Sequence, residues 1–181
     1  SKQFNQEFKV NKDDYFQVGF SVCRDEEPQR VFDKSPFTPE GCDYNLIINM
    51  QAQGLKKRIL HTHAKTVVLG LSGGLDSTLA AIAAVKAVRL AGKSPKDVIA
   101  LTMPCFGTTS RTFDNSVKLA HALGVTLKKI NIGQSVKRHL KDIGHEENVY
   151  DAAYENAQAR ERTQILMDIS NMENGLVVGT G

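Results

Sequence analysis

From Lys65 onward, short continuous apolar runs alternate with longer segments in which apolar residues recur every three or four positions. The short runs are rich in β-branched residues and are typical of buried strands, whereas the longer segments are typical of amphipathic helices. The predicted strands are Thr66–Leu71, Val98–Met103, Thr126–Ile132 and Leu176–Val178, and the predicted helices are Asp76–Leu90, Thr112–Leu123, 136–144 and Tyr150–Met172. Because the strands are continuously apolar rather than alternating, the sheet should be parallel and covered on both faces. We therefore predict an α/β fold with a doubly wound parallel sheet.

The residues before Lys65 follow a different pattern. Over one short stretch apolar side chains alternate with polar ones, which is typical of a half-buried strand, and no partner strand is obvious nearby. These alternating apolar residues are Phe16, Val18, Phe20 and Val22. A linker with two prolines follows at 35–41, and Tyr44–His61 is then predicted to be a helix. The expected core residues of that helix are Leu46, Ile47, Met50, Leu55 and Ile59. We therefore separate a tail with its linker, 1–35, from a domain at 36–181.

Composition and charge narrow the possible classes of protein. The chain of 181 residues has a net charge of +3, which is too small to argue for a nucleic acid or an anionic membrane as partner. No apolar run approaches the ~20 residues that a membrane-spanning helix needs. The three cysteines are odd in number and lack CxxC spacing, which favours free thiols in a reducing compartment. We therefore expect a cytoplasmic protein that binds neither nucleic acid nor membrane.

The stretch LGLSGGLDS, residues 69–77, lies between a predicted strand and a predicted helix. A glycine-rich turn in this position directs several backbone N–H groups to one spot, where the helix dipole favours an anion. The loop has no lysine, so it is not a Walker A motif, and its glycines are misplaced for a GxGxxG fingerprint. The alternative is a tight turn in which Asp76 or Ser77 only stabilises the first helical turn. The complete string SGGLDS favours phosphate binding.

The string SGGLDS resembles the pyrophosphate-binding loop of the ATP-pyrophosphatase superfamily, which includes NAD, GMP, asparagine and argininosuccinate synthetases and tRNA-thiolating enzymes. The resemblance implies a Rossmann-like fold and a reaction in which ATP is cleaved between its α and β phosphates and a substrate oxygen is adenylylated. It also implies that Asp76 holds a magnesium ion, a role that suits a carboxylate beside phosphate oxygens. The residues that it assigns to ATP and pyrophosphate are Gly70, Leu71, Ser72, Gly73, Gly74, Leu75, Asp76 and Ser77.

The stretch YENAQARERTQ, residues 154–164, helps to choose among the members of the superfamily. On a helix, Asn156 and Arg160 share a face, and Thr163 extends it. An amide, a guanidinium and a hydroxyl in one row can bind phosphates and an amide or carboxylate. The alternative is a solvated helix face with Glu161 and Arg162 in surface ion pairs. The apolar stripe of this helix is clearest at Ile165, Ile169 and Met172.

Followed by LVVGTG, residues 176–181, this stretch resembles the signature of glutamine-dependent NAD synthetases. The resemblance runs from about residue 36 to residue 181. It implies that Asn156 and Arg160 contact nicotinic acid adenine dinucleotide (deamido-NAD) and that Thr180 contacts ATP. It also implies that ATP adenylylates the nicotinate carboxylate, and that ammonia from glutamine then displaces AMP to give NAD.

The same resemblance implies parts that the sequence does not contain. These are an upstream nitrilase-like glutaminase domain of the same full-length chain, of which residues 1–33 would be the last strand or two, and an acidic stretch after the terminal GTG. We therefore expect a fragment that is inactive in isolation, and a synthetase domain that forms a homo-oligomer. Two alternatives stay open: another ATP-pyrophosphatase amidotransferase such as GMP synthetase, and a nucleotide-binding module without catalytic activity.

Several other polar residues are assigned to the surface or to the core. The pair His61 and His63 suggests no third metal ligand, so both should be solvated. His139 and His145 belong to a basic segment that we also expect at the surface. Cys23 and Cys42 lie in the tail and linker and are not assigned as the glutaminase nucleophile. Cys105, within the synthetase part, is expected to be a small, half-buried residue.

Overall fold

The computed structural model describes residues 41–106, 110–146 and 148–180. The chain divides into two compact units, Ser1–Cys42 and Asp43–Gly181. The predicted strand around residues 16–22 and the linker up to residue 40 lie outside the described residues. The fold and the site below therefore belong to the second unit.

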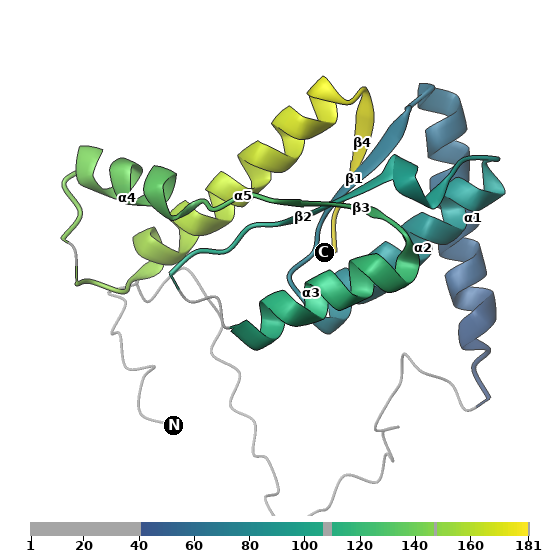
Figure 1. The fold of residues 1–181 in the computed structure, drawn as a ribbon, viewed down its shortest axis with the longest axis horizontal. Helices are drawn as coiled ribbons and strands as arrows, with labels where there is room; N and C mark the ends of the chain where they lie inside the picture. The colour runs from purple at the N-terminus through teal and green to yellow at the C-terminus, as the bar shows by residue number, and fades with distance from the viewer. Residues whose placement is uncertain (1–40, 107–109, 147, 181) are drawn as a thin grey trace, which may run out of the picture. The chain divides into compact units, whose positions relative to one another are not determined.

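The sheet has four parallel strands in the order β3-β2-β1-β4 (Figure 1). The strands are β1 Thr66–Gly70, β2 Val98–Thr102, β3 Thr126–Lys129 and β4 Gly175–Val178. The chain builds outward from β1 through β2 to β3 and then returns to the other side of β1, where Val68 lies opposite Val177. This reversal makes a switch point beside β1, the place where doubly wound sheets bind their ligands. The predicted α/β class and parallel sheet are confirmed.

Five α-helices of the described chain cover the two faces of this sheet (Figure 1). Their bounds are α1 Tyr44–Thr62, α2 Leu75–Leu90, α3 Ser110–Leu123, α4 Gly133–Asp142 and α5 Ala152–Met172, with a short 3-10 helix, η1, at Pro95–Asp97. Helices α1, α2 and α3 contribute to one hydrophobic cluster, and α4 and α5 contribute to the other. None of the described helices is both long enough and apolar enough to cross a membrane.

Successive residues of β1 explain why its sequence is continuously apolar. Val67 and Leu69 enter the cluster under α1, α2 and α3, whereas Val68 enters the cluster under α4 and α5. Each of the three side chains is at most 1% exposed. Because side chains of a strand alternate between the two faces of a sheet, a strand covered on both sides has no polar face.

Helix α1 buries fewer residues than its sequence pattern predicts. Ile59 is buried and Leu55 packs beside it, but Leu46, Ile47 and Met50 are 55%, 41% and 66% exposed. The physical reason is the place of α1 in the fold, since it packs mainly on α2 rather than on the sheet. Its first turns extend past α2 (Figure 1) and have no described neighbour to bury them.

Two other expectations about element ends need correction. The strand predicted to reach Ile132 ends at Lys129, although the Ile130 N–H still donates to the carbonyl of Thr102, the last residue of β2, and the Ile132 N–H donates to the carbonyl of Pro104 just beyond it. Met172, expected in the apolar stripe of α5, is 78% exposed, whereas Ile165 and Ile169 pack on the second cluster. Met172 is the last residue of α5 and lies beyond the sheet surface that the stripe covers.

Two adjacent residues of α1 give a matched stability test. Ile59 is 1% exposed and Leu60 is 50% exposed. We expect Ile59→Ala to lower the free energy of unfolding by about 2–5 kcal/mol, because it removes buried methyl groups and leaves a cavity. Leu60→Ala should change it by less than about 1 kcal/mol. Urea denaturation of both variants checks this, and equal losses would contradict the assigned packing of α1.

Candidate nucleotide-binding site

The loop between β1 and α2 is held closed by two serine hydroxyls. The Ser72 and Ser77 hydroxyl oxygens are 3.0 Å apart, and Ser77 also accepts the Ser72 N–H at 3.3 Å. The Ser77 hydroxyl donates to the Gly74 carbonyl, and the Gly74 N–H donates to the Ser72 hydroxyl. No side chain caps the start of α2, whose N-cap is Gly74. The first N–H groups of this helix therefore remain available to an anion.

Gly73 makes the loop fit against helix α3. Its φ of +80° is in the left-handed region, which a side chain disfavours. A Cβ on this residue would also overlap the backbone carbonyl of Thr112, in the first turn of α3. Glycine is therefore required here by both conformation and close approach.

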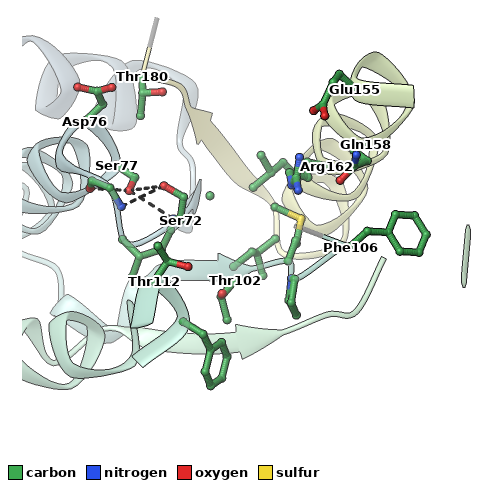
Figure 2. A pocket seen from close by; sticks show the side chains of 18 of the residues that line it. Ser72, Asp76, Ser77, Thr102, Phe106, Thr112, Glu155, Gln158, Arg162 and Thr180 are labelled. Atoms are coloured by element: carbon green, nitrogen blue, oxygen red, sulfur yellow. Dashed lines mark hydrogen bonds between the residues drawn. The ribbon is translucent and has the colours of Figure 1, made fainter. Parts of the chain in front are cut away.

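A cavity of about 880 Å³ opens at the carboxyl edge of the sheet, over this loop (Figure 2). One wall is the loop with Asp76 and Ser77, and another is the end of β2. Thr112 of α3 and a face of α5 complete the lining. Seven of the residues assigned to ATP from the sequence line it: Gly70, Leu71, Ser72, Gly74, Asp76, Ser77 and Thr180. Gly73 and Leu75 do not line it, and Leu75 is 83% exposed.

Thr180 is brought to the loop by the sheet. Val178, two residues before it, lies opposite Leu69 at the end of β1. Since β4 and β1 run parallel, the residues that follow both strands meet at the same edge. The loop residues and Thr180, about a hundred positions apart in the sequence, therefore line one cavity (Figure 2).

Helix α5 contributes a face that the sequence reasoning missed. Glu155, Gln158 and Arg162 line the cavity, whereas the predicted Asn156 and Arg160 are exposed and do not. Successive residues of a helix turn by about 100°, so Arg160, two residues from both Gln158 and Arg162, lies on nearly the opposite face, and Asn156 is about 120° around the helix from Arg162. Their assignment to the dinucleotide stays a prediction. The signal that could have identified Arg162 is its helical spacing with the apolar Leu166, which lines the same cavity.

Three aromatic side chains form a wall of the cavity. Tyr154 stacks on Phe106 with ring centroids 5.9 Å apart and meets Tyr150 edge-on at 5.0 Å. The same three rings line a second cavity of about 830 Å³, which also contains Lys137 and Lys141. Exposed aromatic faces of this kind can stack against a planar base or ring.

The start of α5 is fixed by an interaction that contradicts the expected surface position of His145. The His145 side chain is only 11% exposed, and its Nε2 lies 3.0 Å from Oδ1 of Asp151. Asp151 also accepts the N–H of Tyr154 and so caps the helix. The hydrogen bond from the Tyr154 N–H lowers the pKa of Asp151 most, and the hydrogen bond with His145 lowers it further. His139 is exposed, as predicted.

The remaining candidate ligands do not form a metal cluster. Within residues 41–106, 110–146 and 148–180, no group of three or more His, Cys, Asp and Glu side chains could hold a metal ion. His61 and His63 are exposed, as expected. Cys105 is half-buried, also as expected, and burial raises the pKa of its thiol. Two carboxylates line the cavity, Asp76 in the loop and Glu155 on α5. Asp76, beside the N–H groups of α2, suits a magnesium ion whose other ligands are phosphate oxygens and water.

A parallel α/β sheet with a serine- and glycine-rich anion loop at its switch point defines a nucleotide-binding protein. The family model for NAD synthase matches residues 47–181. The chain therefore belongs to the NAD synthase family.

The relatives include glutamine-dependent and NH3-dependent NAD(+) synthetases. The chain is 44% identical to the glutamine-dependent NAD(+) synthetase of Mycobacterium bovis over 137 residues, which are 74% of this chain and 20% of that protein. It thus spans about a fifth of the length of that relative.

Solved structures show the same fold. The glutamine-dependent NAD+ synthetase of Acinetobacter baumannii, in complex with ADP, superposes with a TM-score of 0.71 at 29% identity, over 79% of this chain and 26% of that one. The NH3-dependent NAD synthetase of Campylobacter jejuni, in complex with a nitrate ion, superposes with a TM-score of 0.68 at 28% identity. The match covers 77% of this chain and 57% of that one. The Rossmann-like fold expected from the loop motif is confirmed.

Replacing Gly73 tests the closeness of the loop to α3. Gly73→Ala should weaken ATP binding by about tenfold or more, because the new methyl group meets the Thr112 carbonyl and displaces the loop. Gly54→Ala is the control, since nothing lies within 4 Å of that position in α1. Calorimetric titration with ATP measures both. Unchanged affinity in Gly73→Ala would show that the contact does not shape the site.

The cap of α5 should depend on pH. The pKa of Asp151 is held below its ordinary value of 3.8, so the stability it provides is fully present above that pH. That stability is lost as the pH falls through the lowered pKa of the folded state. Asp151→Ala should therefore have a lower urea midpoint than the unchanged protein at pH 7, and the gap should close below pH 3.8. A gap that is constant with pH would contradict the cap.

Proposed function

We propose that this chain is the synthetase part of a glutamine-dependent NAD(+) synthetase (EC 6.3.5.1), which amidates deamido-NAD to NAD with ATP. One observation carries the proposal: a lysine-free serine and glycine loop and Thr180 line one cavity in a chain of the NAD synthase family. The ADP complex of the Acinetobacter baumannii relative supports an adenine nucleotide in this fold.

The proposed reaction has two steps. In the first, an oxygen of the nicotinate carboxylate attacks the α-phosphorus of ATP. The bond from that phosphorus to the bridging oxygen breaks, and pyrophosphate leaves with the electron pair. In the second, ammonia attacks the carbonyl carbon of the acyl-adenylate, AMP leaves, and the nitrogen loses a proton to solvent. The products are NAD, AMP and pyrophosphate.

The loop is suited to the leaving pyrophosphate. The uncapped N–H groups at the start of α2 can donate hydrogen bonds to phosphate oxygens, and the hydroxyls of Ser72 and Ser77 hold the loop that carries them. Charge that develops on pyrophosphate would be stabilised by donors that are already in place. The absence of a lysine distinguishes this arrangement from a Walker A loop, whose lysine reaches the β and γ phosphates.

Asp76 is the proposed magnesium ligand. It lies in the first turn of α2, is exposed and lines the cavity. A magnesium ion bound there would neutralise phosphate charge. The carboxylate would act together with phosphate oxygens and water, which is the usual way in which proteins hold this ion.

Asn156 and Arg160 are the proposed contacts to deamido-NAD. They are exposed on α5 and do not line the nucleotide cavity. The proposal therefore requires the nicotinate end of the dinucleotide to reach from these side chains to the cavity, where its carboxylate meets the α-phosphate. Water must be kept from the acyl-adenylate, because hydrolysis would compete with ammonia.

Ammonia is proposed to come from a nitrilase-like glutaminase domain of the full-length chain, with 1–35 as the end of that domain and the linker, and 36–181 as the synthetase domain. The glutamine-dependent relatives support this source. We further propose a cytoplasmic homo-oligomer, and a 181-residue chain that is inactive in isolation.

The alternatives are an amidotransferase for another substrate, such as GMP synthetase, and a nucleotide-binding module without turnover. Isotope exchange between ATP and pyrophosphate in the full-length protein separates them. The proposed function requires exchange that depends on deamido-NAD. Exchange with xanthosine monophosphate alone would favour GMP synthetase, and ATP binding without any exchange would favour the inactive module.

The magnesium ligand is tested by Asp76→Ala in the full-length protein. Exchange that depends on deamido-NAD should fall by about a hundredfold or more, because the site would no longer hold the metal ion that neutralises the phosphate charge. Asp142→Asn is a suitable control, since Asp142 is exposed on α4 and pairs with Arg138 away from the cavity. Full exchange activity in Asp76→Ala would refute the assignment.

A further inference from the structure

Arg162 differs from the other arginines of the described chain in its position. It is half-buried and lines the nucleotide cavity, whereas Arg160, two residues earlier, is exposed outside it. Among the described residues that line this cavity, Arg162 is the only lysine, arginine or histidine. Its side chain is therefore the one positive group that the described lining offers to the charge of ATP.

The guanidinium is available to a ligand. No hydrogen bond or ion pair joins it to another described residue. The neighbouring Gln158 donates to the carbonyl of Tyr154 instead. A half-buried arginine that has no hydrogen-bond partner among the described residues can direct its donors to an oxyanion.

The place of Arg162 in the cavity indicates which phosphate it meets. It projects from α5 on the wall across from Ser72, Ser77 and Asp76 (Figure 2). The positive charge of Arg162 is close enough to the Cys105 thiol to oppose the rise in its pKa that burial causes. Cys105 follows β2 by three residues, so the guanidinium lies near the end of that strand. It is therefore separate from the loop that is proposed to hold pyrophosphate.

We propose that the Arg162 guanidinium binds the α-phosphate of ATP, and of the acyl-adenylate formed from it, opposite the pyrophosphate loop. This inference rests on the proposed function. The α-phosphorus is bonded to the pyrophosphate that leaves and is attacked by the carboxylate of the dinucleotide. Arg162 faces the cavity from the wall across from the loop, so a nucleotide whose pyrophosphate end lies at the loop directs its α-phosphate toward this side chain.

The chemical role of Arg162 follows from charge. Attack of a carboxylate on a phosphate brings two anions together, and the nonbridging oxygens of the α-phosphate carry that charge in the transition state. A planar guanidinium can donate two parallel hydrogen bonds to these oxygens. The contact should strengthen as the reaction proceeds and should affect kcat more than the KM for ATP.

Binding of AMP and of inorganic pyrophosphate to the full-length protein separates the two ends of ATP. Arg162→Gln should weaken AMP binding by about tenfold or more and leave pyrophosphate binding within about twofold. Arg162→Lys should give an intermediate loss for AMP, because it retains the charge but not the paired donors. Arg89→Gln, at an exposed position in the last turn of α2, is the matched control and should change neither.

Equal weakening of both ligands, weakening of pyrophosphate alone, or no change in either would overturn the assignment of Arg162. If Arg162→Gln unfolds at a lower temperature than the control, the decision rests on Arg162→Lys, whose AMP affinity must still fall by about threefold or more. Failure of the unchanged protein to bind ATP would refute the proposed function itself, and this inference with it. The two failures are thus distinguishable.

Discussion

The parallel pairing of β1 with both β2 and β4 is the constraint on which the site depends. It sends the residues after Gly70, Thr102 and Val178 to the same edge of the sheet. An antiparallel β4 of four residues would carry Thr180 to the opposite edge, roughly 13 Å away. Helices α2 and α3, which follow β1 and β2, pack on one face of the sheet, and α5, which precedes β4, packs on the other. The cavity is thus a consequence of strand direction.

Close packing then shapes the loop inside that edge. Gly73 lies against the Thr112 carbonyl, so α3 sets how far the loop can open. The hydroxyls of Ser72 and Ser77 hydrogen-bond to each other and to the backbone of Gly74. They leave the first N–H groups of α2 without a side-chain cap. An anion site built from backbone dipoles needs this rigidity, since dipoles that must reorient stabilise charge poorly. The loop can therefore work without a lysine.

Helix α5 carries two different polar faces on one rigid element. Glu155, Gln158 and Arg162 line the nucleotide cavity, whereas Asn156 and Arg160 are exposed and do not line it. The cap by Asp151, supported by His145, sets where this helix begins. A helix that binds ATP on one face and the dinucleotide on another would hold the two reactants at a fixed distance, which is the main contribution of geometry to a reaction between them.

The sequence alone determined the alternation of strands and helices, the parallel sheet and the turn between β1 and α2, because continuous apolar strands and a glycine turn before a helix are local patterns. It also indicated the family, because the motifs SGGLDS, YENAQARERTQ and LVVGTG are continuous in the sequence. It did not determine which arginine of QARER enters the cavity, that the half-buried His145 pairs with Asp151, or that Leu46 and Met50 stay exposed. Those outcomes depend on the rotation of α5, the path of the chain before it and the position of α1 on α2. Which helix residues become buried depends on packing between elements far apart in the sequence, because an exposed and a buried helix face can show the same spacing of apolar and polar residues.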